Sequence, residues 1–232
     1  MATLTAYLNE RISRIKGAEY RIDPRIDAGY LTSVVLERGL MRVRGRLRFP
    51  LRAQPPFVGA GVRVRCRRRL RLGAGVTLGH GSLIDALSTH GVTLGDNTSV
   101  GRNTRIECTG SLRSIGKGLR VGRDVGLGTD SLYGCAGGIS IGDDTIIGNF
   151  VSFHSENHRI DDRRTPIRLQ GVTHAGITVG SDCWIGARVT VLDGAHIGDG
   201  CVIAAGTVVT AGEYPSGGIY GGVPARLLKN RD

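Results

Sequence analysis

A large apolar residue recurs every six positions over much of this chain, most regularly between residues 141 and 209. The positions in that stretch are Ile141, Ile147, Phe153, Val179, Ile185, Val191, Ile197, Ile203 and Val209. A glycine or another small residue usually follows at once, as in IGDDTI, VGSDCW and IGDGCV. A period of six fits neither an amphipathic helix nor an alternating strand. It is typical of a β-solenoid, in which each hexad forms one short strand and the small residues let the chain turn a corner.

The same period continues upstream, so that the hexads group in threes as six coils of a three-sided prism. The coils are predicted to begin at residues 72, 94, 115, 141, 179 and 197. A coil of three hexads needs eighteen residues, and only the last interval between coil starts, from 179 to 197, has that length. In every longer interval the extra residues come after the third hexad. We therefore expect all insertions to project from one corner. The largest, roughly residues 158–176, is where we expect function, because solenoids carry binding and catalysis on such insertions.

The N-terminal third has a different pattern. Residues 3–16 predict an amphipathic helix, and a weaker helical pattern follows over 26–38. Apolar residues then alternate with arginines over 41–49 and again over 62–71. Such alternation predicts strands with one buried face and one arginine face. The solenoid is expected to begin near residue 58.

Positive charge is concentrated in the same third of the chain. The whole chain has a formal net charge of +11. Residues 1–71 hold 17 Lys and Arg against 5 Asp and Glu, a balance of +12, and the remainder holds 14 against 15, a balance of −1. Two interpretations stay open: the arginine stems cover the open end of the solenoid, or the guanidinium groups attract anionic lipid or a phosphate-bearing or lipid-linked acceptor. Nucleic acid is not expected, because no aromatic residues interleave with the arginines.

Cysteines and apolar runs indicate the cellular compartment. Five cysteines, an odd number without a CxxC pair, argue against a disulfide framework or a zinc ribbon. No signal peptide is recognisable, and no apolar run approaches the roughly eighteen residues that span a bilayer. We therefore expect a cytoplasmic protein.

Four motifs follow one another along the solenoid: IGDDTIIGNFVSFHSENH, ITVGSDCWIG, GDGCVIAAGTVVT and GGVPARLLKN. In this combination the chain resembles the hexapeptide-repeat acyltransferases, most closely their sugar and polysaccharide O-acetyltransferase branch, which includes galactoside and maltose acetyltransferases. The resemblance implies an all-β fold, the left-handed parallel β-helix, with acetyl-CoA as co-substrate, no metal, a sugar or glycan acceptor, and a homotrimer with sites between neighbouring prisms. The expected parts are a basic N-terminal region (1–57), the β-helix (58–214, with the insertion 158–176) and a C-terminal tail (215–232).

His158 is the strongest candidate for a catalytic base. Transfer of an acetyl group from a thioester to a hydroxyl requires removal of a proton from a poor nucleophile, and a neutral imidazole is the usual base. No G-x-S-x-G elbow is present to supply a nucleophilic serine. His158 stands at the exit to the long insertion, and by resemblance it matches the catalytic base of the family. Glu156 either orients this imidazole or is an ordinary surface carboxylate. Four other histidines are expected to be ordinary surface residues: His80, His90, His174 and His196.

The resemblance also implies positions that bind the donor. Trp184, which is expected at a corner, matches a tryptophan that borders the acyl-CoA groove; the alternative is an aromatic that only caps the corner. The backbone N–H of Ala187 matches a donor to the oxyanion. Four further residues match positions that line the CoA channel, the last two near its phosphates: Ala205, Thr210, Arg226 and Lys229. After Thr210 the chain reads AGEYP, where the family usually has a lysine, an acid and a proline.

The acceptor side has fewer matching residues. Asn157, beside the proposed base, and Asp130 are the candidates for acceptor contacts. Gly128 and Ala136 stand where galactoside-type members carry polar residues, so we expect an acceptor other than a simple galactoside.

Three alternatives stay open. The first is a zinc enzyme similar to the γ-class carbonic anhydrases, which share this solenoid; His154 and His158 have even spacing, but no third histidine stands at a convincing spacing. The second is N-acetyl transfer to an amino sugar. The third is a structural or docking solenoid without catalysis, because solenoids serve unrelated functions.

Overall fold

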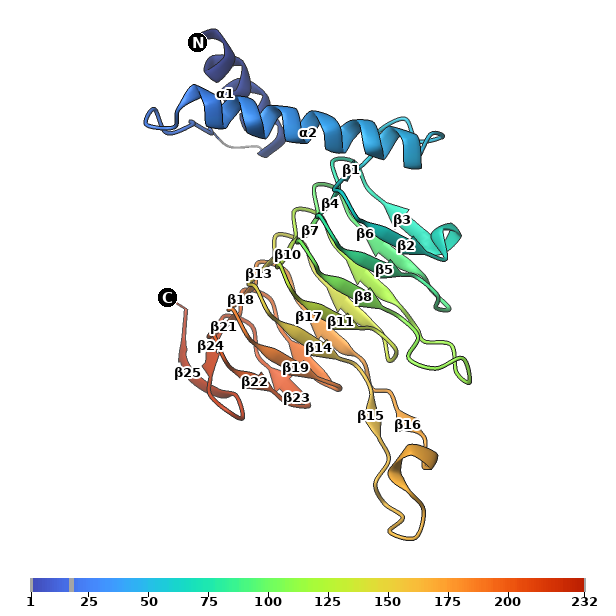
Figure 1. Ribbon diagram of the computed structural model, residues 1–232. Coiled ribbons are helices and arrows are strands. Elements are labelled where there is room, and N and C mark those ends of the chain that lie inside the picture. The colour runs from blue at the N-terminus through green and yellow to red at the C-terminus, as the bar shows by residue number, and fades with distance from the viewer. Residues whose placement is uncertain (1, 17–18, 232) are drawn as a thin grey trace.

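The protein is described by a computed structural model that covers residues 2–16 and 19–231. Short parallel strands stack into a long column, and two helices lie across its N-terminal end (Figure 1). The helices are α1 (Ala2–Lys16) and α2 (Ala28–Arg48). No helix in the part of the chain that is described is long and apolar enough to cross a membrane.

Three parallel sheets form the sides of the column, and we call them sheets A, B and C. Sheet A contains β1 (Phe57–Val58), β4 (Thr77–Leu78), β7 (Ser99–Val100), β10 (Gly126–Leu127), β13 (Ile146–Ile147), β18 (Trp184–Ile185), β21 (Val202–Ile203), β24 (Gly218–Gly221) and the antiparallel β25 (Arg226–Asn230). Sheet B contains β2 (Arg63–Arg65), β5 (Leu83–Asp85), β8 (Arg105–Glu107), β11 (Leu132–Gly134), β14 (Ser152–His154), β19 (Thr190–Leu192) and β22 (Val208–Val209). Sheet C contains β3 (Leu70–Leu72), β6 (Val92–Leu94), β9 (Leu119–Val121), β12 (Ile139–Ile141), β17 (Ile177–Val179), β20 (Ala195–Ile197) and β23 (Gly212–Tyr214).

The hexad residues form the core of the column. All nine apolar repeat positions between 141 and 209 point inward and are at most 4% exposed. The chain runs from sheet C to sheet A to sheet B and back to C in every coil. The predicted fold class, a triangular parallel β-helix, is therefore confirmed.

One coil boundary differs from the prediction. The third coil begins at β9, and Ile115 lies exposed in the loop before it. The inward position of that coil on sheet B is filled by Tyr133, which stacks on Phe153 of the next coil with ring centroids 5.1 Å apart. The sequence prediction was wrong here because this loop carries an isoleucine six residues before Val121.

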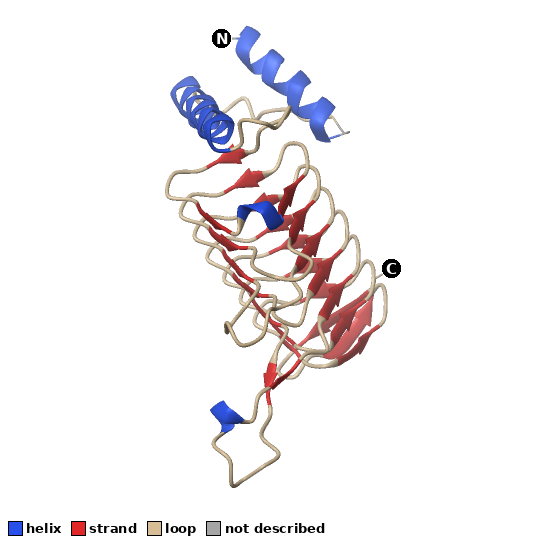
Figure 2. Ribbon diagram, turned by 90° about the vertical axis from the view of Figure 1, so that its right-hand side faces the viewer, coloured by secondary structure: helices blue, strands red, loops and turns tan. Residues whose placement is uncertain are grey.

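The extra residues all lie at one corner, as predicted. Every strand of sheet B begins five positions after the end of the preceding strand of sheet A, whereas the passage from sheet B to sheet C varies. The longest passage, residues 155–176, leaves after β14 and contains the antiparallel strands β15 (Asn157–His158) and β16 (Val172–Thr173) and a short 3-10 helix (Ile167–Leu169). It projects from the column as an arm (Figures 1 and 2).

Helix α2 continues through the segment predicted to be the first arginine strand. Met41, Gly45 and Phe49 are buried against the column, one turn apart, whereas Val43 and Leu47 are exposed on the opposite side. Two apolar faces on one helix place an apolar residue at every second position. The alternation that predicts a strand is therefore a consequence of a helix with apolar residues on both sides.

The second predicted arginine strand is two strands on different sheets. β2 ends at Arg65, Cys66 adopts a left-handed conformation with φ of 52°, and a 3-10 turn (Arg67–Arg69) leads to β3. The interruption is required because the chain passes here from sheet B to sheet C. Cys66 is consequently exposed and does not contribute to the core.

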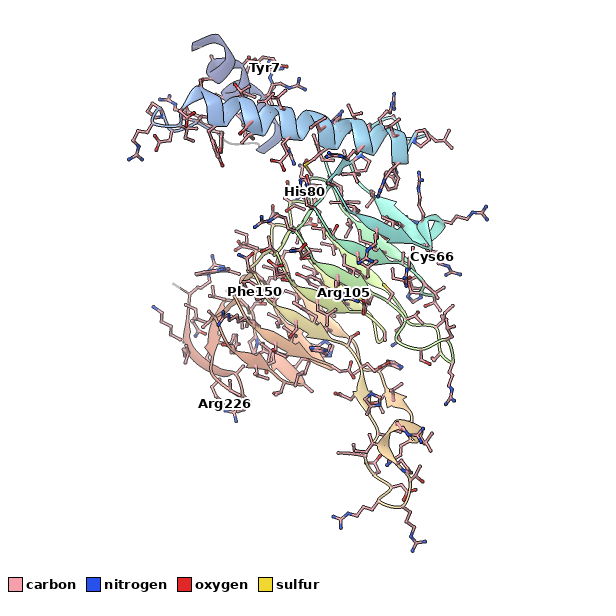
Figure 3. All side chains as sticks on the ribbon, viewed as in Figure 1. Tyr7, Cys66, His80, Arg105, Phe150 and Arg226 are labelled. Carbon is pink, nitrogen blue, oxygen red and sulfur yellow. The ribbon has the colours of Figure 1, made fainter. Side chains whose placement is uncertain are left out.

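Polar contacts hold α2 on the first coils. His80 Nδ1 accepts from the Ala60 N–H (3.1 Å), so Nε2 carries the proton that faces Glu37 Oε1 at 2.8 Å. Figure 3 shows His80 directly beneath the helix. The Arg38 guanidinium lies 4.1 Å from the ring centroid of Phe57. The helix is thus a cap on the open end of the column, as the first interpretation of the arginines proposes for this region.

Candidate functional site

His158 lies at the root of the arm. It is paired across the β15–β16 ribbon with Val172, and Asn157 is paired with Thr173. The side chains of Asn157 and His158 are both exposed. Within the described ranges no hydrogen bond or ion pair engages the His158 imidazole. The ring is therefore available to a group from outside this chain.

Glu156 pairs with a different histidine. Its Oε2 lies 3.8 Å from Nδ1 of His174, and both side chains are partly buried. That Nδ1 atom is itself buried and has no hydrogen-bond partner in the described part of the chain. The ribbon register places Glu156 opposite His174 and two residues from His158, so the three side chains share one face of the ribbon. His174, predicted to be an ordinary surface residue, thus belongs to the arm root. Glu156, for which two interpretations stay open from the sequence, is paired with His174, and no contact with the His158 imidazole is formed in the described ranges.

Asp193 holds the returning end of the arm. This carboxylate is 4% exposed and accepts the backbone N–H groups of Ala175 (2.9 Å to Oδ2) and Gly176 (2.7 Å to Oδ1). Hydrogen bonds to an ionised acceptor are stronger than hydrogen bonds between two neutral groups. The sequence analysis missed Asp193; its signal is the Asp-Gly pair that directly follows β19, at the corner from which the insertions leave.

Trp184 lies on the outer face of sheet A, not at a corner. Its side chain is 57% exposed, so it caps nothing in this chain. Its neighbours across the sheet are Ile146 on one side and Val202 on the other, and the same row continues to Ile219 and Lys229. Sheet A therefore presents an exposed apolar strip with a cation at its C-terminal end.

Ala187 follows Trp184 at the corner between sheets A and B, where its backbone N–H faces the next coil. At the equivalent corner two coils earlier, the Thr129 N–H is capped by Asn149 Oδ1 from the next coil (3.0 Å). The residue that the next coil places against Ala187 is Ala205, which has no side-chain acceptor. Within residues 19–231 nothing accepts from the Ala187 N–H, and the residue is exposed. An exposed backbone donor of this kind is suited to stabilise an oxyanion.

Three of the residues predicted to line the CoA channel divide between two places. Arg226 and Lys229 lie on β25, at the edge of sheet A, and both are exposed; Figure 3 shows Arg226 at the C-terminal end of the column. Thr210 lies at the corner between sheets B and C. Its N–H donates to the Tyr214 hydroxyl (3.1 Å), which donates to the Thr210 carbonyl (3.1 Å). Tyr214 therefore closes the turn in which the chain departs from the family pattern.

The candidate residues form two groups that do not meet within one chain. The arm group contains Glu156, Asn157 and His158, at the corner between sheets B and C. The sheet A group contains Trp184, Ala187, Ala205, Arg226 and Lys229. Asp130 lies at the corner between sheets A and B with φ of 52°, and accepts a hydrogen bond from Asn103 Nδ2 (2.9 Å). The full width of sheet B separates the proposed base from the proposed oxyanion donor.

No metal centre is assembled by the residues that the structure places. In the described ranges, no group of three His, Cys, Asp or Glu side chains is arranged to hold a metal ion. His154 lies exposed at the end of β14, on sheet B, and His158 lies on the arm. The two histidines of the zinc alternative thus have no third ligand in that part of the chain.

Comparison with known proteins supports the repeat and the fold. Residues 176–211 match the family model described as bacterial transferase hexapeptide (six repeats). The probable acetyltransferase Rv3034c of Mycobacterium tuberculosis is 33% identical over 132 residues, which cover 57% of this chain and 44% of that protein. The chain thus spans less than half of the length of this curated relative.

Solved structures of similar shape include two acyltransferases. A variant of AntD, an N-acyltransferase from Bacillus cereus solved with dTDP and coenzyme A, has a TM-score of 0.52 and 20% identity, covering 67% of this chain and 84% of that one. A hexapeptide-repeat acetyltransferase from Vibrio cholerae, complexed with acetyl coenzyme A, has a TM-score of 0.47 and 20% identity, covering 96% and 98%. The resemblance to the hexapeptide-repeat proteins is therefore confirmed, by the family model over the repeats and by AntD for the fold.

Proposed function

We propose that this hexapeptide-repeat protein is an acetyl-CoA-dependent acyltransferase that acetylates a hydroxyl of a sugar or polysaccharide precursor. The observation that carries the proposal is the pair of incomplete half-sites. A free imidazole is presented on the arm, and a free backbone N–H beside an exposed tryptophan is presented on sheet A. Direct acyl transfer requires both a base and an oxyanion donor; the arm supplies the base, and sheet A supplies the oxyanion donor.

His158 is the general base in this proposal. Its neutral imidazole takes the proton of the acceptor hydroxyl while the hydroxyl oxygen attacks the thioester carbonyl carbon. The carbonyl oxygen becomes an oxyanion, which the Ala187 N–H stabilises. When the carbonyl re-forms, the C–S bond breaks and the imidazolium returns the proton to the CoA sulfur. The products are the acetyl ester and free CoA.

Sheet A holds the donor in this proposal. The Trp184–Ile146 strip supplies apolar surface for the uncharged part of acetyl-CoA, and Ala205, one coil beyond Ala187, leaves room beside it. Arg226 and Lys229, at the edge of the same sheet, are placed for the phosphates of CoA. Thr210, at the corner between sheets B and C, is proposed to reach the donor channel of a neighbouring copy. Asn157 and Asp130 are the proposed acceptor contacts.

The two half-sites are proposed to meet between copies of the chain. The arm of one copy brings His158 to the Ala187 corner of its neighbour, and three copies close the ring as a homotrimer. The test is complementation: His158→Ala and Ala187→Pro, which removes the N–H, are each inactive alone. Co-refolded in equal amounts, they are expected to recover about a quarter of the wild-type sites, because random assembly pairs the two intact halves at one interface in four. No recovery between folded variants would place both halves in one subunit.

Calorimetric titration of acetyl-CoA is the first test of the activity itself. We expect wild type and His158→Ala to bind alike, Trp184→Ala to bind more weakly, and His158→Ala to turn over about 10²–10⁴ times more slowly. The matched control is His154→Ala, another exposed histidine four residues away, which should keep wild-type turnover. A wild-type protein that is folded but binds no acetyl-CoA would disprove the proposal.

The product distinguishes hydroxyl from amine transfer. An acetyl ester is cleaved by neutral hydroxylamine, whereas an acetamide is not, so release of label by hydroxylamine supports O-acetylation. Retention of label would assign the N-acetyl alternative on an amino sugar. We also propose that the N-terminal arginines bring the protein into peripheral contact with anionic lipid.

A further inference from the structure

The outer face of sheet C carries a groove of about 490 Å³. Arg71, Lys117 and Arg120 line it, together with His90 and His196. Hydroxyl groups of Thr93, Ser140 and Thr178 also line it. No aspartate or glutamate is among the residues that line this groove. It is separate from the sheet A residues proposed to hold the donor.

Strand register brings the groove's cations together. Arg71, Thr93 and Arg120 are direct neighbours on β3, β6 and β9, so the two arginines stand about 10 Å apart with a hydroxyl between them. Lys117 reaches the groove from the loop before β9, where its carbonyl accepts the backbone N–H of His90 (3.0 Å). These two loop residues therefore border the same part of the groove.

Among the residues that the structure describes, the groove's cations have no carboxylate partners. Sheet B shows the contrast: Arg65 lies 3.6 Å from Asp85, and Arg105 is paired with Glu107. Within the described ranges no ion pair involves any of the three cations of the sheet C groove. Three cationic side chains gathered without a counter-ion in the described part of the chain, next to hydroxyl donors, are suited to a phosphate or diphosphate.

We propose that this groove binds the phosphoryl part of the acceptor, which makes the acceptor a sugar phosphate or sugar diphosphate. The opposite end of the groove is lined by Ala175, Gly176 and Thr178. Ala175 and Gly176 are the last residues of the arm, and His174 alone separates them from the strand that pairs with His158. With its phosphate at Arg120, the acceptor directs its sugar along Ser140 and Thr178 to the arm root. This inference rests on the proposed acyl transfer.

The test compares phosphate ligands with acetyl-CoA in separate titrations. The probes are pyrophosphate and uridine diphosphate, and the variant is Arg71→Gln with Arg120→Gln. We expect the variant to bind both probes at least tenfold more weakly and to bind acetyl-CoA as wild type does. The matched control is Arg63→Gln with Arg105→Gln, the same change on the outer face of sheet B, which should leave all three affinities unchanged.

Two outcomes would overturn the assignment. If the sheet C variant weakens acetyl-CoA and leaves the probes unchanged, the groove serves the phosphates of the donor. If wild type binds acetyl-CoA but neither probe, the groove is no phosphate site, while the proposed function stands. If wild type binds no acetyl-CoA, the proposed function itself fails, so the two failures are distinguishable.

A second inference concerns the outer face of α2. Leu36, Leu40, Val43 and Leu47 are spaced by four, three and four residues, which places them on one stripe, and they are 55–75% exposed. This stripe lies on the side of the helix opposite to the buried Met41 and Gly45. Single exposed apolar residues are common on protein surfaces, but a continuous stripe of four apolar side chains indicates an interaction site.

Charge around the stripe favours an anionic occupant. Arg44 and Arg46 flank the stripe on its two sides. Between Glu37 and Asp85 the chain has twelve arginines and no carboxylate. An amphipathic helix with an apolar stripe between cations lies in the interface of an anionic membrane, with its apolar side chains below the headgroups. We infer that the α2 stripe docks on an anionic lipid surface, with the column pointing away from it.

Vesicle sedimentation tests the membrane inference. We expect wild type to sediment with vesicles of phosphatidylcholine containing a quarter phosphatidylglycerol, and not with phosphatidylcholine alone. Leu40→Ser with Leu47→Ser should abolish sedimentation; the control Leu112→Ser, an exposed leucine on a distant loop, should not. Absence of sedimentation by wild type would overturn the inference. So would a smaller oligomer in the double variant, because the stripe would then pack against another copy.

Discussion

Asp193 is predicted to determine where the arm stands. Its carboxylate accepts from Gly176 at Oδ1 and from Ala175 at Oδ2, and it is almost completely buried. In Asp193→Asn an amide oxygen in the place of Oδ1 can still accept from Gly176 and, at 3.1 Å, from Ala175, but the amide NH₂ in the place of Oδ2 then faces the Ala175 N–H, which lies 2.9 Å from that position. A hydrogen bond to a charged acceptor contributes about 1.5–3 kcal/mol, and a buried donor left unpaired costs a similar amount.

We therefore expect Asp193→Asn to lower the free energy of unfolding by about 2–3 kcal/mol. For a chain of this length that corresponds to a fall in Tm of about 4–12 °C. Thermal unfolding measures the cost, and amide hydrogen exchange at Ala175 and Gly176 shows where it arises, since those two N–H groups should exchange faster. Turnover should fall as well, because the arm root positions His158.

Asp199→Asn is the matched control. Asp199 also caps a corner, but in the described part of the chain its side chain accepts a single backbone N–H, from Ser181 at 2.7 Å, and it is exposed. At another corner the amide oxygen of Asn149 accepts a backbone N–H in the same way, so an amide is sufficient for a cap with one donor. We expect Asp199→Asn to change stability by less than about 0.5 kcal/mol. If Asp193→Asn were equally harmless, the reasoning on the arm root would be refuted.

Three further outcomes are expected. The Tyr133 hydroxyl is buried and has no hydrogen-bond partner among the described residues, so Tyr133→Phe should leave stability unchanged or raise it by about 1 kcal/mol in denaturant unfolding. A Cβ at Gly45 would lie 1.8 Å from the Pro56 carbonyl oxygen, so Gly45→Ala should release α2 from the column, seen as faster proteolysis of residues 28–48; equal protease resistance would contradict this contact. Burial raises the pKa of Cys183 to about 11, so below that pH it stays a protonated thiol; iodoacetamide at pH 8 should label the exposed Cys66 and not Cys183 in folded protein.

The column could be predicted from the sequence because every coil has the same packing requirement. Each coil must bury one large side chain per side, so a large apolar residue recurs every six positions. This period is visible in the sequence without knowing which strands lie side by side. The position of the insertions followed from counting residues between hexads. The same counting failed at Ile115, where a loop residue happened to stand at the right spacing.

The contacts within the arm root and the sheet C groove could not be predicted, because they depend on which strands lie side by side. Arg71 and Arg120 are 49 residues apart in the chain but only two strands apart in the sheet. His174 becomes a partner of Glu156 only because the arm folds back on itself. The C-terminal part of α2, from Met41 to its end, was mistaken for a strand because local alternation cannot distinguish one buried face from two opposite apolar faces.

The constant passage from sheet A to sheet B has a consequence for how such a protein can change. Every coil crosses that corner in the same number of residues, so the strands of sheet A follow one another in the same register. A ligand that lies along sheet A therefore contacts equivalent backbone positions in every coil. All variation in length is confined to the corner between sheets B and C. A longer or shorter arm leaves the register of every strand intact. One side of the column is therefore held constant while the other is free to acquire new recognition loops, and a new partner can be accommodated without redesign of the core.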